Sequence, residues 1–452
     1  MKPHHPAGSC GCILVAQNLG HTWYFNLTTA YVLDFRSARR HQFCINTSPT
    51  AALTGIAAMD SFEAKLAEAT KPESRRILGA IGLVVNNKGE KVYHHASGFQ
   101  SLDDDAQPLD PDSTFALASA GKFITHLAAL QLVERGLVAL DDPVEKHLPE
   151  LASLPLISRD AVGEPCKLHP LTVNKITLRH LLLHTSGLSS PDVSLIREYL
   201  ADDNLAKPSF PDDAPTIVKH FSIPLVFEPG DGFAYGYSIH WTQLLVGRLS
   251  GSGSNFLHYI QENIFDPLGM ASSTYMPRDR PEIWNRRLQM VEREGKTLLP
   301  ADDATQGLTC SVSDTGKILA DLISPSPKVL KDPALVDLLF TGQLPQGSTP
   351  IMDLRSDQEN YMFCAGPCMP GGGLPPAVNW TAAGMVVESG TLELTGLPPG
   401  TVTWQGMPNV MWAMNRERGV AMVFVTQVIP VGDEEAGVLG AEFMKSAWRA
   451  FG

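Results

Sequence analysis

The tetrapeptide Ser119-Ala120-Gly121-Lys122 constrains this chain more than any other stretch of it. A serine and a lysine three positions apart at the start of a helix share one face, and their side chains lie within reach of each other. The apolar residues that follow predict a buried helix, which ends before Gly136, where a C-terminal glycine is expected. Ser119 would then lie at a helix N-terminus, where backbone N–H groups favour negative charge.

These two side chains have the chemistry of a nucleophile and its base. A serine hydroxyl is a poor nucleophile until an adjacent base removes its proton. A lysine can be that base where a dry or cationic environment keeps its amine neutral. The same spacing also occurs by chance, as an N-cap serine followed by a solvated lysine, so the rest of the chain must decide between the two interpretations.

Composition limits the class of partner and the compartment. The 452 residues are 44% hydrophobic and 18% charged, as in globular proteins with a large core. A formal net charge of −13 argues against nucleic acid or an anionic membrane, and no apolar run is long enough to span a bilayer. Seven cysteines, an odd and low number, argue against a disulfide framework and favour a cytoplasmic setting. The sequons at Asn26, Asn46 and Asn379 leave secretion open.

The order of elements predicts an α+β fold. Residues 1–58 lack periodicity and are expected to be an extension outside the core, with a catalytic domain over 59–452. We expect an antiparallel sheet with helices packed on it and an all-helical insertion on one side. The expected α/β part covers about 59–140 and 300–452, and the helical part covers about 141–299.

The expected strands and the last helix follow from local patterns. Residues 80–85 form a buried run, and the turn residues 87–90 lead to a return strand over 91–93. Further strands are expected over 401–404, 410–414 and 420–427, and a closing helix over 435–451.

Two other segments could complete a site near Ser119. Pro229-Gly230 predicts a turn, and a short extended run then puts Tyr235 at the end of a loop. A tyrosine beside an ammonium group can exchange protons with it. Gly406 interrupts a strand, where a glycine lets another backbone or a ligand approach and where N–H groups can complete an oxyanion hole.

Taken in order, these segments resemble the serine β-lactamase and penicillin-binding-protein superfamily. Its pattern is Ser-x-x-Lys, then Tyr-x-Asn or Ser-x-Asn, then Lys-Thr-Gly. Within it, the chain is most similar to the class C-like esterases and transesterases of fungal secondary metabolism. The blocks at residues 134–144 and 176–188 also fit, and the resemblance runs from about Met59 to the C-terminus. It implies a β-lactamase/transpeptidase-like fold.

The resemblance also implies a role for each residue of the site. Ser119 would be the nucleophile and Lys122 its general base, and Tyr235 would assist Lys122 and protonate the leaving group. The backbone N–H groups of Ser119 and Met407 would form the oxyanion hole. The other residues expected to bind substrate are Trp404, Gln405, Gly406 and Tyr237.

Two departures from the superfamily pattern limit the class of substrate that we expect. Tyr237 replaces the Asn that helps to orient an amide side chain, and Trp404 replaces the Lys that meets the carboxylate of a β-lactam. Both favour a small-molecule ester or thioester, free or bound to a carrier protein, as the acyl donor. We therefore expect an acyltransferase that acts on a secondary metabolite through an acyl-Ser119 intermediate. An esterase with water as acceptor is the alternative, and a β-lactamase or a non-catalytic relative are further ones.

Neither a metal nor a cofactor is expected. His180 and His184 have a spacing that could bind metal. The metalloprotease pattern His-Glu-x-x-His is absent, however, because Leu181 and Leu182 follow His180. His184 is expected to buttress the site loop, and His240 to be a packing or surface residue. Because no Gly-x-Ser-x-Gly segment occurs, an α/β-hydrolase is not expected.

Overall fold

The computed structural model describes residues 55–160, 166–170, 173–191, 193–251, 255–301, 307–356 and 378–452, with side chains from Met59 onward. All of these residues belong to one unit, 41–452. Helix α1 (Gly55–Ala69) is the first described element, so the predicted extension 1–58 lies almost wholly outside the described residues. Five cysteines lie outside them as well, and the two described ones, Cys166 and Cys310, are buried and free.

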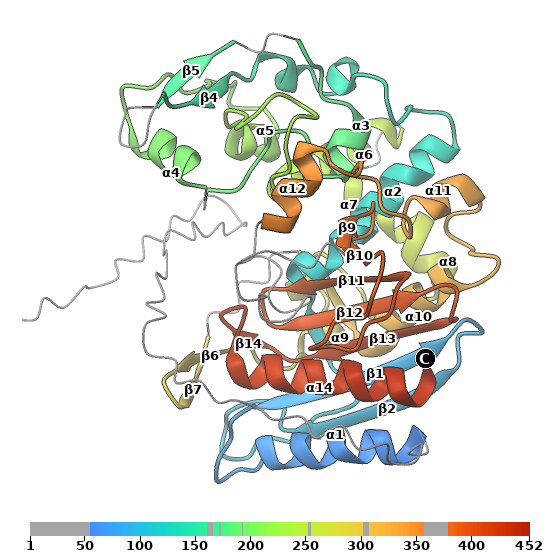
Figure 1. Cartoon of the computed structure of the whole chain (residues 1–452). Helices are drawn as coiled ribbons and strands as arrows, with labels where there is room; N and C mark the ends of the chain where they lie inside the picture. Colours follow the sequence, from blue (N-terminus) through green and yellow to red (C-terminus); the bar gives the residue numbers. More distant parts are fainter. Residues whose placement is uncertain are drawn as a thin grey trace, which may run out of the picture. The chain divides into compact units, whose positions relative to one another are not determined.

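A seven-stranded antiparallel sheet forms the centre of this unit, in the order β2-β1-β13-β12-β11-β10-β9 (Figure 1). Its strands from the beginning of the domain are β1 (Gly79–Asn86) and β2 (Lys91–Gly98). Its strands from the end of the chain are β9 (Val378–Trp380), β10 (Met385–Val387), β11 (Thr401–Gly406), β12 (Val410–Asn415) and β13 (Val420–Val425). The pairing of β1 with β13 therefore joins two ends of the domain into one sheet.

Helices cover both faces of this sheet, which explains why β13 is apolar and buried along its whole length. On one face, Gly82 lies against α14 (Glu434–Phe451), since a Cβ there would come within 2.5 Å of the Phe443 ring. On the other face, Leu83 lies against α10 (Val312–Ile323), where a Cβ on Gly316 would come within 2.6 Å of it. Helix α1 packs on α14.

The nucleophile segment joins the sheet to the helical part. The 3₁₀ turn η2 (Ala118–Gly121) packs on β11, and helix α2 (Lys122–Glu134) follows it directly. Residues Phe123 to Leu132 of α2 are all buried, as predicted for a helix enclosed on every side. Helix α6 (Ser238–Leu249) packs along α2.

The other α-helices and strands of the described residues are short. The helices are α3 (Leu178–Leu182), α4 (Ser194–Ala201), α5 (Thr216–Phe221), α7 (Phe256–Ile260), α8 (Asp266–Leu268), α9 (Pro281–Trp284), α11 (Pro333–Asp337) and α12 (Thr349–Ser356). The strands are β3 (Thr114–Ala116), β4 (Leu156–Ser158), β5 (Lys167–His169), β6 (Val291–Glu294), β7 (Thr297–Pro300), β8 (Thr309–Ser311) and β14 (Val428–Ile429).

The predicted mixed fold, an antiparallel sheet flanked by helices, is confirmed. The sequence did not predict the strand pairs β4–β5 and β6–β7, which lie within the range expected to be all-helical. They are only three or four residues long, so they carry too little alternation to be recognised.

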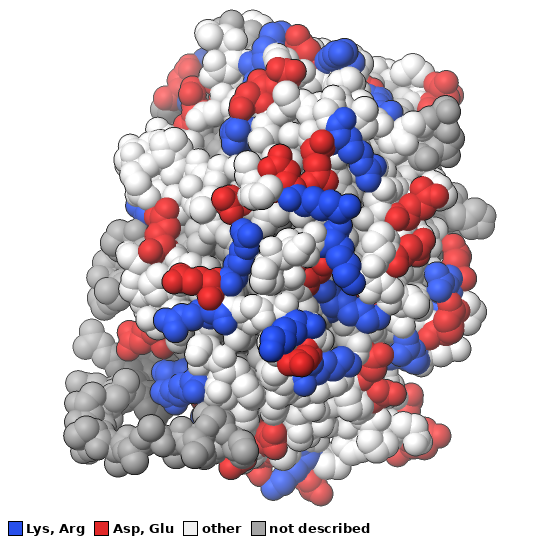
Figure 2. Space-filling model, turned by 90° about the vertical axis from the view of Figure 1, so that its right-hand side faces the viewer, with Lys and Arg blue, Asp and Glu red and all other residues white. Residues whose placement is uncertain are grey.

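The described surface carries charges of both signs. Lys and Arg side chains are interspersed with Asp and Glu over the face in Figure 2. Exposed ion pairs such as Arg416–Asp337 contribute only about 0–1 kcal/mol each. No helix among the described residues is long and apolar enough to cross a membrane.

Candidate active site

Ser119 and Lys122 lie side by side at the start of the buried helix. Ser119 lies in the 3₁₀ turn and Lys122 is the first residue of α2, so the α-helix begins three residues later than the nucleophile. The Lys122 Nζ donates a hydrogen bond to the Ser119 Oγ at 2.6 Å. Ala118 has a φ of 48°, which a residue with a side chain adopts only where its surroundings impose it. The turn is therefore held in a strained conformation directly before the nucleophile.

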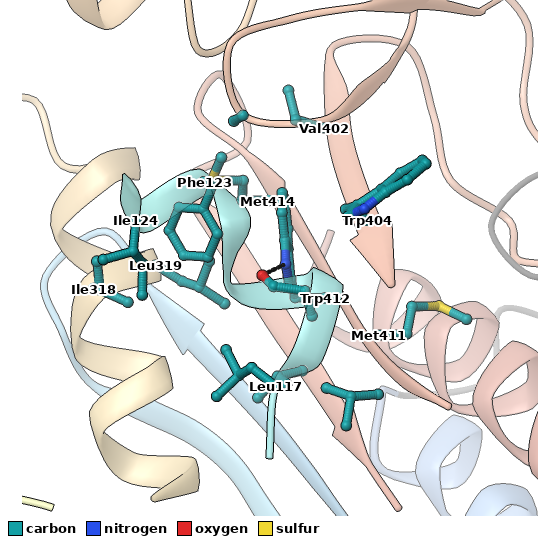
Figure 3. Close-up of a cluster of buried hydrophobic side chains, with 14 of the residues drawn as sticks. Leu117, Phe123, Ile124, Ile318, Leu319, Val402, Trp404, Met411, Trp412 and Met414 are labelled. Carbon is teal, nitrogen blue, oxygen red and sulfur yellow. Dashed lines mark hydrogen bonds between the residues drawn. The ribbon is translucent and has the colours of Figure 1, made fainter. Parts of the chain in front are cut away.

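Strands β11 and β12 pack against the turn that carries Ser119. The Trp412 Nε1 donates to the carbonyl oxygen of Ala120 at 2.8 Å, and Figure 3 shows this indole lying between the sheet and the turn. The Phe123 ring packs edge-on against Trp412 at a centroid distance of 5.1 Å. Gly406 lies so close to the turn that an added Cβ would overlap the Leu117 carbonyl oxygen. Met407, whose N–H is predicted to belong to the oxyanion hole, directly follows Gly406 in the chain.

Gly406→Ala is expected to lower kcat/KM for a chromogenic ester by about 100-fold, the cost of displacing reacting groups by about 1 Å. The added methyl group forces β11 and the Ser119 turn apart. Gly247→Ala is a matched control, because its Cβ would come no closer than 3.3 Å to another atom. If Gly406→Ala were as active as Gly247→Ala, contact with β11 would not position the nucleophile.

Tyr235 is carried by a loop that rests on the segment around His184. The Ala234 N–H donates to the His184 carbonyl at 2.9 Å. Gly236 leaves no room for a side chain, because a Cβ there would overlap the backbone of Ser189. His184 itself has a φ of 56° and is buried. The segment around His184, which the sequence predicts to support the site, therefore packs against the loop that carries Tyr235.

The Tyr235 side chain reaches both Lys122 and Trp404. The Lys122 Nζ lies 4.9 Å from the centre of the tyrosine ring and over its face. The Trp404 Nε1 donates to the Tyr235 Oη at 3.1 Å. A phenol oxygen that accepts one hydrogen bond still carries a proton that it can donate elsewhere. This geometry is suited to a tyrosine that passes a proton to a reacting group.

Tyr235 and four neighbouring rings pack together, and we name these five rings the Tyr235 aromatic cluster. Its members are His184, Phe233, Tyr235, Trp380 and Trp404. Trp380 is not among the site residues predicted from the sequence, where its segment shows only the sequon at Asn379. Trp404 and Trp380 are 4% and 2% exposed, so the hydrogen bond to Tyr235 is made in an environment that is largely closed to water.

The structure also places Gln405, Tyr237 and His240, the other residues considered in the sequence. By strand alternation the Gln405 side chain points to the face of β11 opposite Trp404 and Gly406, so it does not join them at the site. Tyr237 packs edge-on against Phe221 at a centroid distance of 4.6 Å. His240 stacks flat on Phe221 at 3.9 Å, as expected for a packing residue.

No metal site is formed by the His, Cys, Asp and Glu side chains of the described residues. His180 instead belongs to a capping box at the start of α3, where its Nδ1 accepts from the Thr177 N–H at 3.2 Å. His126, which follows Lys122 by one helical turn, donates through its Nδ1–H to the Ala382 carbonyl oxygen, 2.9 Å away.

Three histidines near Lys122 are held neutral. Burial first, together with the charge of Lys122, lowers the pKa of His126 to about 4 and that of His240 to about 3. Burial, His126 and Lys122 hold the pKa of His184 well below its ordinary value. The site behind Lys122 therefore contains polar rings but no second cation at neutral pH.

The stability of the protein is expected to fall as the pH decreases below about 6.5. Between about pH 6.5 and 4 the unfolded chain binds protons that the buried histidines cannot bind, so unfolding becomes more favourable. At pH 5 His126 alone contributes a loss of about 2 kcal/mol, since each unit of pKa corresponds to about 1.4 kcal/mol.

Urea unfolding at pH 7.5 and pH 5 measures this effect. The loss should be smaller in His126→Asn, which has no group that titrates in this range. An equal loss in the variant and the wild type would show that other groups cause the acid sensitivity.

Comparison with known proteins identifies the family. A Beta-lactamase family model matches residues 62–437. The acyltransferase CalJ of Penicillium decumbens is 32% identical over 87% of this chain and 99% of the relative. The lovastatin esterase of Penicillium rubens is 29% identical over 84% of this chain and 96% of the relative. The LovD6 mutant of simvastatin synthase (LovD) from Aspergillus terreus has a TM-score of 0.73 at 29% identity, over 89% of this chain and 98% of that one. The chain therefore belongs to the β-lactamase family, in its branch of serine acyltransferases and esterases.

Proposed function

We propose that this enzyme transfers a short acyl group from an ester or thioester to an alcohol group of a small secondary metabolite. The observation that carries the proposal is the indole of Trp404, which lies at the site and donates a hydrogen bond to Tyr235. The superfamily has a lysine at this position, which meets the carboxylate of a β-lactam. A neutral, buried indole cannot neutralise a carboxylate, so the site favours an uncharged acyl donor.

The proposed reaction has two halves that use the same groups. With its amine neutral, Lys122 takes the proton of the Ser119 hydroxyl to which it is hydrogen-bonded, while the Ser119 Oγ attacks the donor carbonyl carbon. The N–H groups of Ser119 and Met407 hold the negative oxygen that forms. The donor alcohol or thiol leaves with a proton from Tyr235 and Lys122, and the acyl group stays on Ser119. The acceptor hydroxyl then gives its proton to the same pair while its oxygen attacks the acyl carbon. The bond from the acyl carbon to the Ser119 Oγ breaks, and Lys122 returns a proton to this oxygen.

The test is an incubation with a short-chain acyl thioester, with and without a panel of polyketide alcohols, followed by mass spectrometry. An acylated alcohol that forms faster than free acid supports the transferase. The same acyl group attached to a purified carrier protein tests whether the donor is carrier-bound, since this donor should then be used at lower concentration. Ser119→Ala, run in parallel, gives the background of uncatalysed acylation.

Ester hydrolysis is the second candidate, because the lovastatin esterase matches this chain over nearly the same length as the acyltransferase does. Both reactions share the acyl-Ser119 intermediate and differ only in what attacks it. Free acid as the sole product, together with an acyl adduct on Ser119, would identify an esterase and exclude the transferase for these acceptors.

We also propose that the enzyme acts in the cytoplasm. Asn379, one of the three sequon residues, is 1% exposed, and its Nδ2 donates to the Leu344 carbonyl and to Glu388. A glycan on this nitrogen would require both hydrogen bonds to break. Cell fractionation tests the proposal, and a secreted, glycosylated protein would contradict it.

A further inference from the structure

We propose that Trp380 is a positioning residue, whose indole holds Trp404 in the orientation in which its N–H donates to Tyr235. The inference rests on the acyl-enzyme chemistry proposed above. It is drawn from the geometry of three rings and of the strands that carry two of them.

The hydrogen bond from Trp404 to Tyr235 depends on the rotation of one ring. An indole has a single N–H, fixed in its plane, and the torsion that turns this plane is only weakly restricted by the side chain itself. Neighbouring groups must therefore set the plane. Trp380 meets Trp404 at a centroid distance of 4.6 Å and an interplanar angle of 85°, the edge-to-face arrangement that aromatic rings prefer.

Trp380 also contacts the loop that carries the acceptor of this hydrogen bond. Its ring lies edge-on at 5.3 Å from Phe233 and at 6.1 Å from Tyr235. It further packs at 5.5 Å against His184, the residue on which the tyrosine loop rests. One buried side chain thus fixes both the donor ring and the loop of the acceptor.

The strands that carry Trp380 and Trp404 are joined through β10. Met385 of β10 pairs with Trp380 of β9 on one side and with Thr403 of β11 on the other. Gly384 allows this close packing, since a Cβ there would lie 3.2 Å from the Cβ of Trp404. The Trp380 carbonyl also accepts from the Gln343 N–H at 2.8 Å. These contacts attach β9, the edge strand of the sheet, to β10 on one side and to Gln343 on the other.

The test compares Trp380→Phe, Trp404→Phe and the double variant with wild type. Each change keeps an aromatic ring, and Trp404→Phe removes only the N–H and part of the ring. Trp448→Phe is a matched control, because Trp448 is a buried indole on α14, outside the Tyr235 aromatic cluster. The rate of Ser119 acylation by a chromogenic ester is followed as a burst, together with KM, the pH profile and the thermal midpoint.

Trp380→Phe should slow acylation by about 10-fold, an effect typical of a small misplacement of catalytic groups, with KM changed by less than about twofold. Its pH profile should shift in the same direction as that of Trp404→Phe. In the double variant the two losses should not multiply, because both act through one hydrogen bond. Trp448→Phe should acylate as fast as wild type.

Three results would overturn the proposal. These are losses that multiply in the double variant, a pH profile that does not move, and a change in KM or thermal midpoint alone. If Trp380→Phe does not fold, Trp380→Tyr replaces it under the same criteria. Because the burst reports only Ser119 acylation, it is independent of which acceptor or donor is natural. Failure of the transferase proposal would instead appear as an absence of acylated alcohol in wild type.

Discussion

Ser119→Ala is expected to lower turnover of any ester or thioester substrate by roughly 10⁵- to 10⁶-fold, as loss of a nucleophile does in other serine enzymes. The methyl group cannot form the acyl intermediate, and Lys122 loses the oxygen to which it is hydrogen-bonded. The residual rate should equal the contribution of the oxyanion hole and of substrate binding alone. Steady-state kinetics measure the loss of turnover, and intact-protein mass spectrometry measures the loss of the acyl adduct.

The same variant should fold normally, because Ser119 is only half-buried and its turn is held by the backbone of Ala120 and by Gly406. An unchanged thermal midpoint would therefore attribute the loss to chemistry. A fluorophosphonate probe should label wild type and leave Ser119→Ala unlabelled. Activity near that of wild type, or an acyl adduct on another residue, would contradict the assignment of the nucleophile.

The parts of the site that sequence alone could predict are those built from neighbouring residues. Ser119 and Lys122 are three positions apart, so their contact follows from local geometry, and the hairpin of β1 and β2 follows from its turn chemistry. Only the exact start of the helix differed, because the first turn is 3₁₀ and the α-helix begins at Lys122. Helix ends are determined by local packing that a hydrophobic pattern does not encode.

The part that sequence could not predict depends on the register of distant strands. Trp380 reaches Trp404 only because β10 aligns Met385 with both Trp380 and Thr403, and no local pattern around Trp380 indicates this. The pairing of β1 with β13 is of the same kind, since it joins segments more than 300 residues apart. The placement of Gln405, in contrast, could have been predicted from the sequence. The alternation of side chains along a strand implies that Gln405 faces away from Trp404.

Lys122→Met is expected to lower the rate of Ser119 acylation by at least about 10³-fold, within the range that a positioned base contributes. Methionine has nearly the same length and fits the half-buried site, but it has no nitrogen to accept the Ser119 proton. Since Ser119 and Lys122 act as one unit, the double variant Ser119→Ala/Lys122→Met should be no slower than Ser119→Ala. Burst kinetics with a chromogenic ester measure the single variant, and steady-state rates measure the double.

Lys122→Arg separates the loss of the base from the loss of the positive charge beside Tyr235 and the buried histidines. A guanidinium keeps the charge but does not give up its proton in a protein, so it cannot serve as a base. If Lys122 acts as the base, both variants should be slowed to a similar extent. If its charge alone supports catalysis, Lys122→Arg should keep most of the acylation rate while Lys122→Met loses it, and Tyr235 would then be the group that takes the Ser119 proton.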